Sequence, residues 1–255
     1  MIKLNRPSKP KELEDNEQQL TDEYLISCNK VEKGEIKYKK RVWDKDYIRT
    51  PLHKMSYGKC AYCETRSGSL EIEHFLCRSK HAELVVRWTN LLLACHECNN
   101  KWKHEIDCEK EPIIDPSKEN PKDYLVFKEL LFMPRDRFNK IAYNTIEIFQ
   151  YNTRDDLTMT YFIIRKDINQ KINQYYIDAG NINKNNEIFK NTLGAKIEAL
   201  LKLAQKDHAY SAVYATIILK HTVYEDLITK LKSNKIWNED SMGQLDRNMR
   251  EIALI

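Results

Sequence analysis

Two cysteine pairs carry the clearest chemical signal in the sequence. Each has the form Cys-x-x-Cys, first at Cys60 and Cys63 and again at Cys95 and Cys98. Such a pair turns tightly enough to aim two sulfur atoms at one ion, so the four thiols suit a tetrahedral Zn²⁺ site. The pairs are 31 residues apart, more than the roughly 15–20 residues of a zinc ribbon. We therefore predict a structural zinc ion, with a strand and a long loop between its two halves.

A carboxylate and an imidazole, Glu73 and His74, lie between the cysteine pairs. A neutral imidazole, with a reference pKa of about 6.5, can take a proton from water at physiological pH. The Glu73 carboxylate can bind a hard divalent cation through oxygen. A general base beside a cation ligand supplies two of the parts needed for phosphodiester hydrolysis.

The elements that hold these residues are a small strand–strand–helix unit. Alternation over residues 70–75 predicts one strand, the apolar run 91–94 predicts another, and a helix can extend from about Glu97 through Lys103. So small a unit cannot bury enough apolar surface unaided, and bound zinc would stabilise it.

On the N-terminal side, apolar residues at helical spacing predict a helix over residues 10–31. Thr50 and Pro51 predict the N-cap and first position of a short helix that Gly58 ends. Between these helices, the basic residues of 30–41 are interleaved with Tyr38 and followed by Trp43. This stretch is either a solvated connector or a strip that contacts phosphates.

Beyond residue 110 the chain becomes mainly helical. Residues 113–116 suggest a short strand, and 123–133 and 141–149 are apolar runs of undecided type. A turn and cap are expected at 152–156, and helices at 157–178, 186–206 and 209–233, with possible breaks at Gly180 and Gly194. The polar tail after Trp237 is not placed.

Together these patterns predict an α+β fold, a small zinc-stabilised core in a mainly α-helical chain. We expect an N-terminal helical segment at 1–57, the core at 58–110 and a mainly helical region at 111–255.

Composition restricts the setting more than the activity. The 255 residues are 42% hydrophobic, and 42 basic against 38 acidic residues give a net charge of +4. That balance neither requires nor excludes nucleic acid. The sequence has no apolar run of the roughly 20 residues that a membrane helix needs, and its first residues lack the apolar core of a signal peptide. We expect a cytoplasmic protein, in which reduced thiols favour metal binding over disulfides.

The motif residues resemble a known family. Glu73-His74, Thr89 to Cys95, and Cys98-Asn99 resemble the HNH motif of ββα-metal endonucleases. More narrowly, residues 59–64, 72–75 and 88–95 resemble the retron- and Septu-associated (PtuB-like) HNH nucleases of bacterial antiphage defence. The resemblance is specific over about 58–103 and looser elsewhere.

The resemblance implies a role for each matching position. His74 matches the general base, and Glu73 the acidic position that binds a catalytic Mg²⁺ or Mn²⁺. Asn90 matches the central asparagine that positions the histidine-bearing loop, and Asn99 the last motif position, which completes the metal site. The structural zinc ligands match Cys60, Cys63, Cys95 and Cys98.

Two positions depart from the family pattern. Glu73 replaces the usual aspartate, which changes the reach to a metal ion. Trp102 stands where many HNH sequences have lysine, which leaves Lys101, Lys103 and His104 as candidate phosphate contacts, with His104 also a candidate for the metal.

The resemblance also implies a function. It implies an endonuclease that cleaves nucleic acid, with DNA expected, and an ABC-type ATPase protein partner encoded nearby. The helices after residue 150 are either the docking platform for that partner or a self-contained cap. The alternative function is a catalytically inactive, zinc-stabilised module that binds nucleic acid or protein.

Overall fold

The computed structural model describes residues 1–66, 68–181 and 186–255 and divides the chain into two compact units. The first comprises residues 3–120 and 139–149, and we call it the cysteine unit because it contains both cysteine pairs. The second comprises residues 1–2, 121–138 and 150–255, and we call it the helical unit. The regular elements of the described residues are helices and two small antiparallel sheets, which confirms the predicted α+β class.

The sheet of the cysteine unit pairs β1 (Leu70–His74) with β2 (Leu91–Cys95) in antiparallel register, so that Glu73 faces Leu92 and His74 faces Leu91. Both predicted strands are confirmed. Every residue of β2 is buried, as its leucine-rich sequence requires. The segment Glu97–Lys103 is helical as predicted, but as the wide π-helix η3. Short 3₁₀ turns, η1 (Ala82–Leu84) and η2 (Trp88–Asn90), lie in the loop between the strands.

Two α-helices precede the sheet. The first, α1 (Lys11–Glu32), confirms the helix predicted at 10–31. The second, α2 (Asp46–Met55), contains Pro51 in its interior, so the start predicted at Thr50 and Pro51 is wrong. The reason is burial: Ile48, Leu52 and Met55 lie on one buried face, and burying Ile48 compensates for the hydrogen bond that Pro51 cannot donate.

α2 ends at Met55, and the turn that closes it contains Tyr57, with φ +56°, and the predicted Gly58. Gly58 has φ +65°, and its N–H donates to the His53 carbonyl at 2.9 Å. The N–H of Tyr57 donates to the Lys54 carbonyl at 3.2 Å, which completes a Schellman motif. This turn leads the chain directly into the first cysteine pair.

The helix α3 (Lys140–Ile148) completes the cysteine unit. Phe149, which follows it, stacks on Tyr62 with ring centroids 4.3 Å apart. The Ile114 N–H donates to the Thr145 hydroxyl at 2.9 Å. The strand suggested at residues 113–116 is therefore wrong, because this backbone pairs with a helix side chain instead of another strand.

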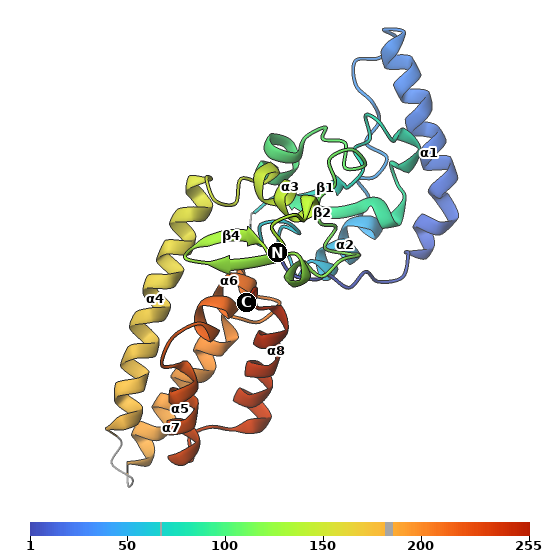
Figure 1. Ribbon diagram of the computed structural model, residues 1–255. Helices are drawn as coiled ribbons and strands as arrows, with labels where there is room; N and C mark the ends of the chain where they lie inside the picture. The colour runs from blue at the N-terminus through green and yellow to red at the C-terminus, as the bar shows by residue number, and fades with distance from the viewer. Residues whose placement is uncertain (67, 182–185) are drawn as a thin grey trace. The chain divides into compact units, whose positions relative to one another are not determined.

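The helical unit contains the second sheet and five α-helices in its described residues (Figure 1). After the turn η4 (Pro121–Asp123), β3 (Leu125–Lys128) and β4 (Leu131–Pro134) form a hairpin. The rings of Phe127, Phe132 and Tyr161 pack together with centroids 4.9–5.6 Å apart. The remaining elements are α4 (Asp155–Gly180), α5 (Glu187–Lys202), α6 (Ser211–Leu219), α7 (Tyr224–Ser233), η5 (Glu239–Gly243) and α8 (Gln244–Ile252).

Most of the predicted helical boundaries hold here. A turn precedes α4 near the expected position, and Gly180 is its last residue. Gly194 does not break α5, and a Cβ there would lie in ordinary van der Waals contact, 3.4 Å from Ile236. The single helix predicted at 209–233 is two, α6 and α7, and the polar tail forms η5 and α8. None of the helices in the described residues is long and apolar enough to cross a membrane.

Candidate active site

The four cysteines of the two pairs meet in one buried cluster. Their sulfur atoms all lie within 4.8 Å of one another, and the Cys63 and Cys95 sulfurs are 3.7 Å apart. The first pair is fixed to the sheet by the Ala61 N–H, which donates to the Leu93 carbonyl at 2.8 Å. Hydrogen bonds from the neighbouring thiols hold the pKa of Cys95 below its usual range. Four convergent sulfurs are the donor set that a tetrahedral metal ion such as zinc takes.

His74, the last residue of β1, has its two ring nitrogens in different settings. Nε2 lies 2.8 Å from the Val85 carbonyl oxygen. A carbonyl oxygen can only accept a hydrogen bond, so Nε2 carries the proton and the neutral ring keeps a lone pair on Nδ1. Nδ1 has no hydrogen-bond partner among the described residues. Burial, together with the charge of Arg78, lowers the pKa of His74 to about 3, which favours the neutral base form.

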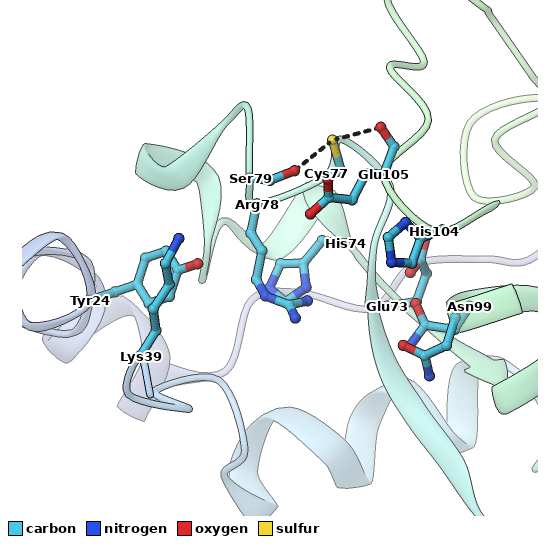
Figure 2. Close-up of a pocket in the computed structure, with 11 residues that line it drawn as sticks. Tyr24, Lys39, Glu73, His74, Cys77, Arg78, Ser79, Asn99, His104 and Glu105 are labelled. Carbon is cyan, nitrogen blue, oxygen red and sulfur yellow. Dashed lines mark hydrogen bonds between the residues drawn. The ribbon is translucent and has the colours of Figure 1, made fainter. Parts of the chain in front are cut away.

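Trp43 packs against the imidazole of His74. Its ring meets that of His74 edge-on, with centroids 4.9 Å apart. The guanidinium of Arg78 lies 4.8 Å from the centre of the Trp43 ring. In Figure 2 the Arg78 side chain overlaps the His74 imidazole in projection, and its charge contributes to the lowered pKa of His74. The tryptophan therefore connects the segment before α2 to the loop that follows His74.

Asn90, at the end of η2, holds that loop. Its side-chain oxygen accepts from the Leu76 N–H at 2.7 Å, and its amide nitrogen donates to the Leu76 carbonyl at 3.0 Å and the Leu84 carbonyl at 3.3 Å. The side chain is buried. It thus ties together both ends of the segment between His74 and Val85, the partner of the imidazole.

Glu73 is buried beside a lysine. Its Oε1 lies 2.7 Å from Nζ of Lys103 and 3.2 Å from the Tyr62 hydroxyl. Nζ of Lys103 also donates to the His74 carbonyl at 3.0 Å. Burial lowers the pKa of Lys103, but the charges of Glu73 and Cys108 and the hydrogen bond to Glu73 together raise it above its usual value. Lys103 therefore lies inside the protein and compensates the charge of Glu73.

Asn99, in η3, is oriented by Glu71 of β1. Its amide nitrogen donates to Glu71 Oε2 at 2.7 Å. The amide of Asn100 donates to the same oxygen, and His96 Nδ1 lies 3.1 Å from Glu71 Oε1. Since the side-chain nitrogen of Asn99 is used in this way, the side-chain oxygen remains available as a ligand.

One pocket of about 170 Å³ gathers four of the predicted residues: Glu73, His74, Asn99 and His104 (Figure 2). Asn90 stands behind the loop and does not line it. The two lysines also lie elsewhere, since Lys103 is fully buried and Lys101 is exposed and pairs with Glu97 at 3.3 Å.

The same pocket contains residues that the motif did not indicate, including Tyr24, Lys39 and Arg78. Figure 2 shows Tyr24 and Lys39 on one side of His74, with Asn99 and His104 on the other. The basic stretch at 30–41 was the sequence signal for Lys39. Arg78 had no such signal, because its place depends on how the loop after His74 folds.

The comparisons with known proteins identify relatives. The chain is 31% identical over 261 residues to Septu protein PtuB of Bacillus thuringiensis, an alignment that covers 100% of this chain and 96% of that protein. It is 25% identical over 210 residues to Septu protein PtuB of Bacillus mycoides (strain KBAB4), covering 67% of this chain and 69% of that protein. No family model matches the sequence, and no solved structure matches it. The full-length similarity to the first of these proteins shows that the chain belongs to the Septu protein PtuB family.

Proposed function

We propose that this protein is a metal-dependent HNH endonuclease that hydrolyses phosphodiester bonds in nucleic acid, with DNA as the expected substrate. The observation that carries the proposal is the state of His74. Its Nε2–H is committed to the Val85 carbonyl at 2.8 Å, its buried Nδ1 has no hydrogen-bond partner among the described residues, and the residue lines a pocket together with Glu73 and Asn99.

In the proposed reaction His74 is the general base. Nδ1 takes a proton from a water molecule whose oxygen attacks phosphorus, and the bond from phosphorus to the leaving oxygen breaks. The Val85 carbonyl stabilises the imidazolium that forms, because it keeps its hydrogen bond from Nε2. Asn90 positions this pair through its three hydrogen bonds to Leu76 and Leu84.

The oxygen donors of the pocket fit a catalytic Mg²⁺ or Mn²⁺. Glu73 uses Oε1 for Lys103 and Tyr62, and its other oxygen has no hydrogen-bond partner among the described residues. Carboxylate and amide oxygens are the ligands that such hard cations take. Glu73 and Asn99 would hold the ion, with His104 as a further donor. When bound, it supplies stabilisation of the negative charge on the leaving oxygen.

We assign Cys60, Cys63, Cys95 and Cys98 to a structural zinc ion with no role in the chemistry. Four thiolates fill a tetrahedral site and leave no position for water or substrate. The supporting observation is the burial of all four sulfur-bearing residues.

We further propose that the protein is the effector nuclease of a cytoplasmic antiphage defence system and is controlled by an ABC-type ATPase. The names of the two Septu relatives support the setting. In this proposal residues 1–57 are the N-terminal segment, 58–110 the nuclease core and 111–255 the partner-binding region. On α4, the side chains of Met159, Phe162 and Ile163 are 61%, 55% and 57% exposed at helical spacing, a surface suited to a protein partner.

The test of the nuclease proposal is a cleavage assay on the full chain, alone and with its ATPase partner, in Mg²⁺ or Mn²⁺. We expect His74→Ala to lower the cleavage rate by about 10²–10⁴-fold, the usual contribution of a general base, while zinc content and folding persist. His53→Ala, which changes an exposed histidine of α2 outside the pocket, is the matched control.

If the wild-type chain cleaves neither DNA nor RNA under these conditions, or if His74→Ala cleaves as fast as the control, the proposal is wrong. The zinc-stabilised binding module would then be the better account.

A further inference from the structure

A second pocket lies next to the pocket at His74. The second, of about 420 Å³, also belongs to the cysteine unit. Both pockets are lined by the same four residues: Lys39, Arg78, Asn99 and Asn100. The first pocket adds His74, and the second adds Tyr38. Because they share these lining residues, the two pockets are adjacent, and we call them together the groove, with His74 lining one end and Tyr38 the other.

Tyr38 is presented to solvent at the end of this groove. It lies in the irregular segment 33–45 between α1 and α2 and is 73% exposed. The segment is fixed to α1 by the Lys40 N–H, which donates to the Ser27 hydroxyl at 3.0 Å. The Lys37 ammonium lies 5.1 Å from the centre of the Tyr38 ring. An anchored segment that exposes an aromatic face beside cations has the composition of a base-stacking platform.

Neither of the two cations shared by both pockets is paired with a carboxylate among the described residues, although Arg78 lies over the Trp43 ring. Lys39 and Arg78 are exposed and make no ion pair with any carboxylate among residues 1–66, 68–181 and 186–255. Their neighbours differ, because Lys40 pairs with Glu23 and Arg41 pairs with Asp44, each at 3.3 Å. Glu71, Glu73 and Glu105 also line these pockets, but none of the three pairs with Lys39 or Arg78, so both cations keep their charge for a phosphate.

We infer that this groove binds single-stranded nucleic acid, with Tyr38 stacking on an unpaired base and Lys39 and Arg78 contacting phosphates next to the scissile one. In a duplex both faces of an internal base are covered by its neighbours, whereas a single strand can offer a face to the ring. The inference rests on the proposed nuclease function for the position of the scissile phosphate, but strand binding is measured without cleavage.

The experiment measures binding of a fluorescein-labelled oligonucleotide to the full chain carrying His74→Ala, by fluorescence anisotropy. The same oligonucleotide is used single-stranded and annealed to its complement. Adding Tyr38→Ala is expected to weaken single-strand binding about 5- to 150-fold, the effect of about 1–3 kcal/mol for one base–aromatic stack. Tyr38→Phe keeps the ring and should retain the affinity. Tyr143→Ala, which removes a 56% exposed tyrosine of α3 in the same unit, is the matched control.

The phosphate contacts are tested through salt dependence. Lys39→Gln should reduce the slope of log affinity against log salt concentration by about 0.7, the value for one phosphate on a single strand. Lys54→Gln, which changes an exposed lysine of α2 outside both pockets, should leave the slope unchanged. These variants separate a phosphate contact from a general effect of charge.

The inference is supported if the single strand binds more tightly than the duplex and Tyr38→Ala weakens that binding while Tyr143→Ala does not. It is overturned if Tyr38→Ala binds like Tyr143→Ala, if the duplex binds as tightly as the single strand, or if neither probe binds. Each of these results leaves the cleavage assay with His74→Ala independent, so failure of the groove is distinguishable from failure of the nuclease proposal.

Discussion

At the scale of single residues, each of the three main site side chains has two polar atoms, and the fold occupies one of them with a hydrogen bond or an ion pair. His74 commits Nε2 to Val85, Asn99 commits its nitrogen to Glu71, and Glu73 commits Oε1 to Lys103 and Tyr62. In each case the fold holds one polar atom of the side chain, and the other is the one to which we assign the proposed chemistry. The motif predicted Glu73, His74 and Asn99 as site residues. It did not predict their partners, because Val85 and Lys103 reach the site only through the fold of the loop and of η3.

Lys103 illustrates that difference and gives a stability prediction. It was a candidate phosphate contact by sequence, and the structure places it against Glu73 with no exposed surface. We expect Lys103→Met to lower the free energy of unfolding by about 3–5 kcal/mol, because it leaves a buried carboxylate without its partner. Lys101→Met, two residues away in an exposed pair with Glu97, should change it by about 0–1 kcal/mol.

Urea denaturation followed by circular dichroism measures both variants. Equal stabilities for Lys103→Met and Lys101→Met would show that the Glu73–Lys103 pair does not stabilise the fold.

At the scale of elements, the sheet brings the two cysteine pairs together. The first pair precedes β1 and the second begins at the last residue of β2, so the antiparallel register of the sheet brings the sulfurs together. Spacing and alternation were sufficient to predict this much. They were insufficient at Pro51, where burial of Ile48 extends α2, and at residues 113–116, where Thr145 takes the backbone N–H. Tertiary contacts from distant segments decided both.

This arrangement predicts how the protein responds to loss of the proposed zinc. Purified chain should contain one zinc per molecule by mass spectrometry, and chelation should lower Tm by at least about 10 °C, since a loss of several kcal/mol lowers Tm by about 2–4 °C per kcal/mol in chains of this size. Cys95→Ser should lose the zinc as well.

Cys28→Ser is the control, because Cys28 is a buried thiol of α1 outside the cluster. Wild-type protein that contains no zinc and keeps its Tm in chelator would argue against the assignment of the cluster.

At the scale of the whole molecule, the chain consists of two units, and the sequence predicts the structure of one better than that of the other. The cysteine unit contains the motif, and its strands and first helix were predicted from local patterns. The helical unit has no chemical motif. The helices of this unit were predicted from the periodicity of apolar residues. The division of 209–233 into α6 and α7 was not predicted, because α6 is mostly apolar and has no alternation of polar and apolar residues that would show where it ends.

The helical unit is where we expect the ATPase partner to bind. Phe162→Glu on the exposed face of α4 should weaken capture of the ATPase encoded beside this gene by at least about 30-fold, the effect of losing one interface hot spot. Thermal stability should be unchanged, because the side chain is 55% exposed. Ile26→Glu, which alters a 55% exposed residue of α1 in the other unit, is the matched control. Unaltered capture by Phe162→Glu would instead favour a self-contained helical cap.

The measurement that tests the account most directly is the position of Mn²⁺ in crystals of the full chain soaked with the ion and a short oligonucleotide. Anomalous scattering identifies the ion. The account predicts a peak in the His74 pocket, about 2.0–2.6 Å from an oxygen of Glu73, with a water molecule between Nδ1 of His74 and a phosphorus atom. A pocket without an ion, or a phosphate bound away from His74, would contradict it.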